Sequence, residues 1–239
     1  MTREALIART MVELADNLVG DFDVVDLLAT LTERCVEVLD IAAAGILLVA
    51  ADGQLRAMCS SDETSRVVEL LEMQPHDGPC MECLRTGAAV SRDLAANQDH
   101  SRHVAASALT AGVRWVDAIP MRFRGQIIGV LTLFRDERCG LGDDDVATAQ
   151  ALADVATIAL LQHRAGAGTD VLRSRLADAL SDRIVIEQAK GVVAERLQVS
   201  IGDALVRLRS YARDQDRRLS DLARDTVRGI VDVAASDRR

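Results

Sequence analysis

Residues 186–191 read Ile-Glu-Gln-Ala-Lys-Gly and lie inside a helical pattern that continues to Leu197. Before this segment, apolar side chains recur at helical intervals, at Val171, Leu172, Leu176, Leu180 and Ile184. This spacing is close to a heptad repeat. It therefore predicts that the helix begins as a coiled-coil-like entry helix and that the chain forms a homodimer.

Two shorter amphipathic helices are expected after it. Ser200 and Asp203 form a loose capping box for a helix through Ala212, and residues 214–218 form the next turn. Ser220 is expected to cap a third helix, whose inward face holds Leu222, Ala223, Val227, Ile230 and Val231. Three amphipathic helices of this kind predict a bundle.

This half of the chain resembles an ANTAR domain from residue 176 to residue 231. The resemblance is carried by the segment at 186–191, by Val199-Ser200, by Leu-Arg-Ser-Tyr-Ala at 208–212 and by Leu-Ser-Asp-Leu-Ala at 219–223. It implies an RNA-binding transcription antitermination regulator, whose dimers bind tandem hairpins in nascent RNA. It also implies that RNA meets a polar surface made of Gln188, Ala189, Lys190, Gly191, Arg209 and Tyr211.

The residue types suit that role. Lys190 is the only lysine among 28 basic residues, and Ala189 and Gly191 leave room for a phosphate or base to approach it. Tyr211 is the only ring in this half that could stack on a base. The alternatives are that Ala189 and Gly191 are small because another helix crosses there, and that Tyr211 belongs to the core.

The preceding half predicts an α+β fold. Helices are expected at residues 4–19, after Asp23, at 62–73, at 80–85 and from Asp143 to about His163, and residues 100–111 are helical or irregular. Strands are expected at 42–49, 54–60, 88–91, 113–121 and 126–134. This order describes a sheet with helices packed on it.

Residues 1–164 resemble a GAF domain, through Ile127-Ile128-Gly129-Val130-Leu131-Thr132-Leu133 and through Gly78-Pro79-Cys80 with Arg85-Thr86-Gly87. The resemblance implies a mainly antiparallel sheet flanked by helices, in a module that senses an unidentified small-molecule ligand or dimerises. GAF domains that bind cyclic nucleotides carry an Asn-Lys pair, which a chain with Lys190 as its single lysine lacks. Residues 165–171 are the expected linker, and 172–239 the ANTAR domain, an arrangement of the actinobacterial type.

Five cysteines form an odd set that predicts reduced thiols. Cys80 and Cys83 could form a redox disulfide, and a helix beginning at Cys80 would lower the pKa of its thiol. With His76, and with His100 or His103, they could instead hold a metal. The third reading is two small buried residues. We assign no metal and no cofactor.

The net charge of −9 is unevenly distributed. Residues 170–239 hold 14 basic and 12 acidic residues, a net of +2, which leaves −11 for residues 1–169. Such asymmetry indicates two domains with different partners. No catalytic motif is recognisable, so an enzyme is not expected, and no apolar run approaches the length of a membrane span.

The sequence therefore predicts a cytoplasmic RNA-binding regulator. Two other readings stay open besides thiol or metal sensing. One is a DNA-binding protein of the helix-turn-helix kind, against which the third helix carries two arginines and two aspartates. The other is a scaffold whose surface binds proteins.

Overall fold

The computed structural model describes residues 2–19, 23–61, 78–96, 110, 112–136, 139–162 and 169–233. Several expected segments lie outside these residues. They are the expected helix at 62–73, residues 100–109 and 111 of the segment expected to be helical or irregular, and residues 165–168 of the expected linker. The described helices are α1 (Arg3–Val19), α2 (Val24–Leu39), α4 (Pro79–Thr86), α6 (Asp143–Gln162), α7 (Thr169–Leu197), α8 (Ile201–Asp214) and α9 (Leu219–Val227). The strands are β1 (Ala43–Val49), β2 (Leu55–Ser60), β3 (Val90–Asp93), β4 (Trp115–Phe123) and β5 (Gln126–Arg135).

The five strands form one antiparallel sheet in the order β2-β1-β5-β4-β3. β1 and β5 are its central pair, and Gly129 lies opposite Leu48. A Cβ atom at Gly129 would stand 2.5 Å from the Leu47 carbonyl oxygen, so the close approach of these strands requires glycine here. The glycine of the expected core strand thus has a packing function.

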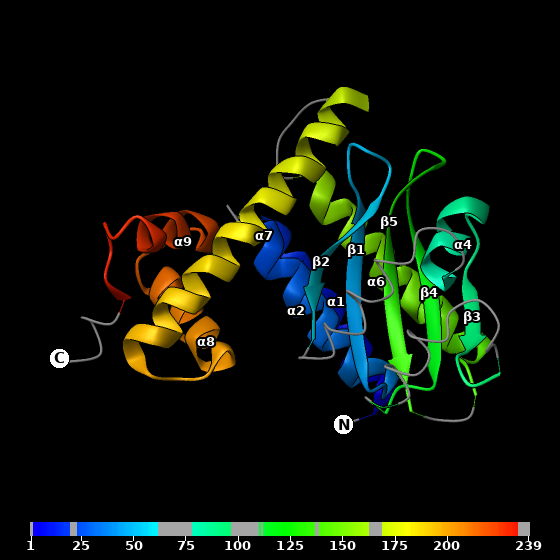
Figure 1. The fold of residues 1–239 in the computed structure, drawn as a ribbon. Coiled ribbons are helices and arrows are strands. Elements are labelled where there is room, and N and C mark those ends of the chain that lie inside the picture. The colour runs from blue at the N-terminus through cyan, green and yellow to red at the C-terminus, as the bar shows by residue number, and fades with distance from the viewer. Residues whose placement is uncertain are drawn as a thin grey trace.

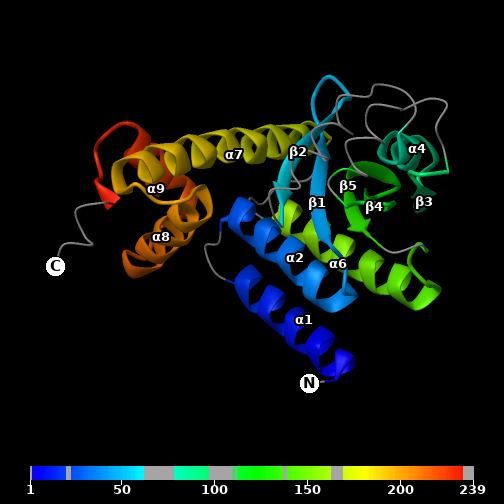
Figure 2. The ribbon, with the colours of Figure 1, turned by 60° about the horizontal axis from the view of Figure 1, so that its bottom comes forward.

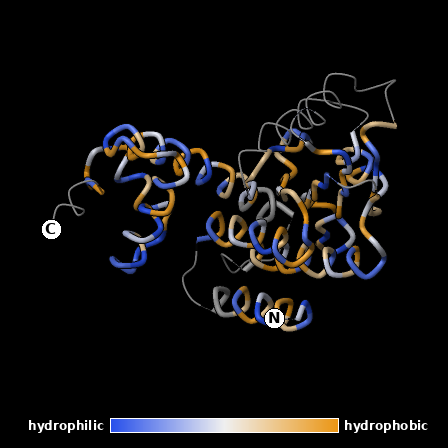
Figure 3. Tube along the Cα trace, turned by 90° about the horizontal axis from the view of Figure 1, so that it is seen from below, coloured by the Kyte–Doolittle hydropathy of each residue, from blue (hydrophilic) through white to orange (hydrophobic). Residues whose placement is uncertain are grey.

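Helices cover both faces of the sheet (Figures 1 and 2). On one face, α2 and α6 pack their apolar sides against inward residues such as Ile46, Met121 and Leu131, and α1 lies outside α2. On the other face, α4 contributes Cys80 and Cys83 to a second apolar cluster. Hydrophobic and hydrophilic positions alternate along the helices of both lobes, as amphipathic elements require (Figure 3). The predicted α+β fold is confirmed.

Two strands lie two residues later than expected. β4 spans Trp115–Phe123 instead of residues 113–121. β3 spans Val90–Asp93 instead of residues 88–91. α4 ends at Gly87, which adopts a left-handed conformation with φ 67°. The chain then reaches the sheet where Val90 pairs with Ala118 and Asp93 with Trp115. Pairing with β4, which local sequence does not reveal, sets the position of this strand.

α7 joins the two lobes of the molecule, which are the sheet with its helices and the bundle that contains α8 and α9 (Figure 1). Its first half contributes Leu176 and Ala179 to the same apolar cluster as α2 and α6, and the Arg183 guanidinium donates to the Ala57 carbonyl of β2. Its second half packs with α8 and α9. Ile184, from the expected coiled-coil seam, is 59% exposed. Dimerisation through this seam stays a prediction.

The caps of the last two helices have different origins. Ser200 caps α8 as expected: its Oγ accepts from the Asp203 N–H at 3.0 Å and donates to the Asp203 carboxylate at 2.7 Å. The expected cap of α9 is wrong. Arg218 is the N-cap residue and uses no side chain for it, while Ser220 is fully buried inside the first turn. The acceptor for the Ser220 N–H comes from elsewhere in the chain.

The inward face expected for the third helix is also wrong in part. α9 ends at Val227, and Gly229 follows with φ 73°. Ile230 therefore lies outside the helix and is 67% exposed, and Val227 is exposed as well. Val233 is buried instead. Among the described residues, no helix has the length and apolar character needed to cross a membrane.

Candidate nucleic-acid interface

The segment Ile186–Gly191 lies in the second half of α7, and its residues point in different directions. Gln188 and Gly191 are exposed, and nothing lies within 4 Å of a Cβ atom placed on Gly191. Ala189 is fully buried within the apolar cluster. The Ala189 methyl group therefore does not face a ligand in this structure, and a contact of this residue with RNA stays a prediction. The helix-crossing explanation holds for Ala189, whereas Gly191 faces open space.

Lys190 is held by a neighbour on its own helix. Its Nζ donates to both carboxylate oxygens of Glu187, at 2.8 and 3.0 Å. The Lys190 side chain is 14% exposed, whereas that of Glu187 is 51% exposed. An ion pair of this spacing on a helix surface stabilises by only about 0.2–0.5 kcal/mol. The ammonium can therefore exchange Glu187 for another anion at low cost.

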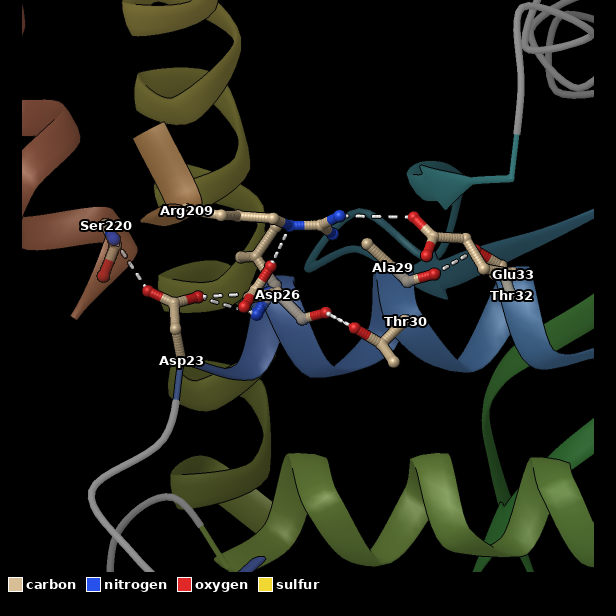
Figure 4. A network of polar contacts seen from close by, with 9 residues as sticks. Asp23, Asp26, Ala29, Thr30, Thr32, Glu33, Arg209 and Ser220 are labelled. Atoms are coloured by element: carbon tan, nitrogen blue, oxygen red, sulfur yellow. Dashed lines mark hydrogen bonds and ion pairs between the residues drawn. The ribbon is translucent and has the colours of Figure 1, made fainter. Parts of the chain in front are cut away.

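Arg209, on α8, contacts the other lobe of the molecule. Its Nε donates to the Asp26 carboxylate, and its Nη1 donates to Glu33 Oε1 at 3.2 Å (Figure 4). Both carboxylates belong to α2, and the Arg209 side chain is only 17% exposed. The structure thus groups Gln188, Lys190 and Gly191 on α7 but holds Arg209 against α2.

Tyr211 is half-buried and packs against the apolar cluster of the bundle. Its ring is partly used in the core, as one of the two sequence-based readings anticipated. The exposed remainder is the part available to a ligand.

Burial and charge act against each other at the contact between Arg209 and α2. Burial raises the pKa of the Asp26 carboxyl above its usual range, although the positive charge of Arg209 opposes this shift. Burial alone would lower the pKa of Arg209, but the carboxylates of Asp26 and Glu33 outweigh it and raise that pKa. Arg209 is therefore a full cation beside the carboxylates.

Asp23 connects the same two elements through a second set of contacts. Its Oδ1 accepts from the N–H groups of Val25 and Asp26, at 2.9 and 3.3 Å, which caps α2. Its Oδ2 accepts from the Ser220 N–H at 2.7 Å, which supplies the missing cap of α9 (Figure 4). One carboxylate thus caps two helices that are almost 200 positions apart in the chain.

Sequence reasoning did not find Asp26 or Glu33, and it saw Asp23 only as a helix start. Acidic residues near the beginning of a helix are common, because they favour the positive end of its dipole. Nothing local to α2 signals a partner on α8 or α9.

A cleft of about 1110 Å³ opens beside these contacts, between α1 and α2 on one side and α8 and α9 on the other. Its walls carry charges of both signs. On the α1 and α2 side the charged groups are carboxylates, those of Glu13, Asp23 and Asp26. The α8 and α9 side carries arginines, Arg209 and Arg213 among them, together with aspartates. Across this junction, Arg209 forms ion pairs with Asp26 and Glu33.

The thiols of α4 do not have the expected reactivity. Cys80 and Cys83 are both buried in the second apolar cluster, and burial raises the pKa of each thiol to about 12. The expected lowering at the helix start is wrong, because desolvation outweighs the dipole. His76, His100 and His103, the other members of the metal hypothesis, lie outside the described residues.

Comparison with known families agrees with this architecture. The GAF domain model matches residues 23–161, and the ANTAR domain model matches residues 174–227. These matches fall inside the expected domains 1–164 and 172–239, whose bounds stay predictions. A comparison with curated protein sequences found no match.

Solved structures resemble the sheet-bearing lobe in fold. The GAF domain of an Acinetobacter phosphoenolpyruvate-protein phosphotransferase is 12% identical with a TM-score of 0.52, over 71% of this chain and 100% of that one. The free methionine-R-sulfoxide reductase from Neisseria meningitidis is 18% identical with a TM-score of 0.52, over 68% and 90%. The GAF domain of A. aeolicus NLH2 is 13% identical with a TM-score of 0.52, over 68% and 100%.

Such low identities show a shared fold and nothing about activity. The family matches carry more. GAF domains are sensory, and ANTAR domains are RNA-binding regulators of antitermination. The chain belongs to the GAF domain family and carries a C-terminal ANTAR domain, which places it among the RNA-binding regulators of transcription antitermination.

Proposed function

We propose that this protein acts as a homodimer that binds tandem hairpins in nascent RNA through its ANTAR bundle, under the control of its GAF domain. The observation that carries the proposal is the ANTAR match over α7, α8 and α9, the helices on which the proposed RNA-binding residues lie. RNA hairpin loops expose unstacked bases and phosphates, which proteins read with a few placed side chains.

In this proposal Lys190 is the phosphate contact. When RNA binds, a phosphate oxygen replaces Glu187 as the partner of the Lys190 ammonium. The open space over Gly191 lets the RNA backbone approach α7 closely, and Gln188 offers an amide to a base edge. Arg209 and the exposed edge of Tyr211 extend the same surface through α8. Ala189 supports it from within the core.

The second copy is proposed to pack along α7. Ile184 is a large apolar side chain that is 59% exposed on this helix, one turn after the partly buried Leu180. A dimer would bury Ile184 and present two copies of the RNA surface to two hairpins. Two weak sites joined in this way bind far more tightly than one.

Thiol sensing through Cys80 and Cys83 is disfavoured, because both thiols are buried and hard to ionise. DNA binding through α9 is also disfavoured. The Arg224 guanidinium of that helix already pairs with Asp182 and Asp221. A small-molecule signal for the GAF domain stays part of the proposal.

The direct test compares the full-length wild type with Lys190→Ala, using tandem-hairpin RNA and duplex DNA of equal length at several salt concentrations. Lys190→Ala should weaken RNA binding about fivefold or more, roughly 1 kcal/mol, since a charged hydrogen bond is lost. It should also lower the slope of log affinity against log salt by about one.

Arg196→Ala is the matched control. It removes a cation from the same helix, and Arg196 pairs only loosely with Asp232, at 3.5 Å. It should change the affinity far less than Lys190→Ala does. Equal RNA affinity of wild type and Lys190→Ala would refute the site, and a preference for duplex DNA would refute the function.

A further inference from the structure

We propose that the acidic face of α2 competes with RNA within the same molecule. Asp26 and Glu33 hold Arg209, and Asp23 holds the start of α9, so that the ANTAR bundle is latched against the GAF domain. We call Asp23, Asp26, Glu33, Arg209 and Ser220 the latch. The inference rests on the proposed function, in which Arg209 belongs to the RNA surface.

The carboxylates of the latch form a row. Asp26 and Glu33 are seven residues apart on α2, which places them on one face of the helix, two turns from each other. Figure 4 shows Arg209 extended along this face, between the two carboxylates. A row of anionic oxygens offers a guanidinium the same hydrogen-bond acceptors as the phosphates of an RNA strand. Arg209 can serve only one of these partners at a time.

Within the latch, Asp23 connects α2 to α9. Because its two oxygens cap α2 and α9 together, the two helices are held by one side chain that is only 8% exposed. α2 is also part of the sheet-side core, where Leu28, Leu31 and Cys35 are fully buried. A shift of α2 that follows a change in the GAF core would therefore disturb Asp23 and Asp26 at once.

The latch is incompletely satisfied, which suits a contact that must open. Among the described residues, Arg209 Nη2 and Ser220 Oγ are both buried without a hydrogen-bond partner. Buried polar groups without partners oppose the closed arrangement. RNA or water would satisfy the Arg209 nitrogen once α8 leaves α2.

When the latch is closed in most molecules, the apparent RNA affinity equals the affinity of the open form multiplied by the fraction of molecules that are open. Two partly exposed ion pairs together correspond to a factor of about 2–30 in that equilibrium. Removing them should raise the RNA affinity by up to this factor.

The test uses the full chain with Asp26→Asn and Glu33→Gln combined. The matched control combines Glu37→Gln and Asp40→Asn, which removes the same charge from the same helix. Glu37 pairs with Arg34, and Asp40 ends α2 in a left-handed conformation that asparagine tolerates. Two readouts are taken: affinity for tandem-hairpin RNA, and hydrogen exchange of the Ser220 amide.

The latch variant should bind RNA about 2–30 times more tightly than wild type, and its Ser220 amide should exchange faster. The control should match wild type in both. Adding Arg209→Ala to the latch variant should remove the gain in affinity, because Arg209 is the residue for which α2 and RNA compete.

Three results would overturn the latch. One is an equal gain in the control, which would show a general charge effect. Another is a gain that survives Arg209→Ala. The third is faster Ser220 exchange without any gain in affinity, which would leave the proposed function standing. By contrast, absence of RNA binding in both wild type and latch variant would refute the proposed function, and the latch with it.

Discussion

Lys190 lies between two small residues, Ala189 and Gly191, that have different surroundings. Burial explains the small size of only one of these neighbours. Ala189 is small because it is buried in the core, and Gly191 has no such reason. In our proposal, the missing Cβ atom at Gly191 makes room for RNA.

Replacing Gly191 with alanine separates folding from binding. No atom lies within 4 Å of the added Cβ, and alanine favours a helix over glycine by roughly 0.5–1 kcal/mol. Gly191→Ala should therefore raise the free energy of unfolding in urea by about that amount and weaken RNA binding. Gly202→Ala, in the exposed first turn of α8, is the control that should leave RNA binding unchanged. Unchanged RNA affinity in Gly191→Ala would remove this residue from the proposed site.

At the scale of elements, most helices and strands were predictable because their signals are local. The signals are Asp23 before an apolar helix, Ser200 with Asp203, and the nearly continuous apolar runs of β1 and β5. Each lies within a few residues of the structure it determines. The errors arose where a distant segment decides. β3 takes its position from β4, and α9 takes its cap from Asp23. The partners of Arg209 were unpredictable for the same reason.

The shared cap allows a selective test with Asp23→Asn. Asparagine caps helices about as well as aspartate, but it offers one acceptor oxygen where Asp23 uses two. Either α2 or α9 must then lose its acceptor, and the free energy of unfolding should fall by about 1–2 kcal/mol.

Hydrogen exchange at Val25 and Ser220 would show which helix loses its cap. Ser220→Ala is the control, because it removes a hydroxyl that has no partner and keeps the N–H that Asp23 accepts. That variant should be neutral or slightly stabilising. A loss of stability in Ser220→Ala equal to that in Asp23→Asn would contradict the shared cap.

In the whole molecule, part of the uneven charge forms contacts between the two domains. The net of −11 in residues 1–169 and +2 in the rest had suggested domains with different partners. In the structure, part of that complementarity is used between the domains, where α2 carboxylates meet Arg209 and line the cleft with further arginines. In our proposal, RNA and the GAF domain compete for Arg209 with the same kind of charge.

Salt should open the molecule as well as weaken RNA binding. The latch pairs are partly exposed, so raising the ionic strength from about 0.05 to 0.5 M screens them. Size-exclusion chromatography with in-line small-angle scattering should show wild type expanding within one oligomeric state. Arg209→Ala should be expanded at low salt already and respond little. Identical salt responses of the two proteins would contradict an electrostatic contact between the lobes.

The central claim is that this protein binds hairpin RNA through Lys190 and that α2 restrains this binding. Sequencing the RNA crosslinked to wild type, Lys190→Ala and Asp26→Asn/Glu33→Gln, each expressed in the native cell, tests both parts together. We expect enrichment of tandem hairpins that overlap terminators, a loss of this enrichment in Lys190→Ala and a gain in the latch variant. Enrichment that is the same in all three proteins, or recovery of RNA without paired hairpins, would contradict the claim.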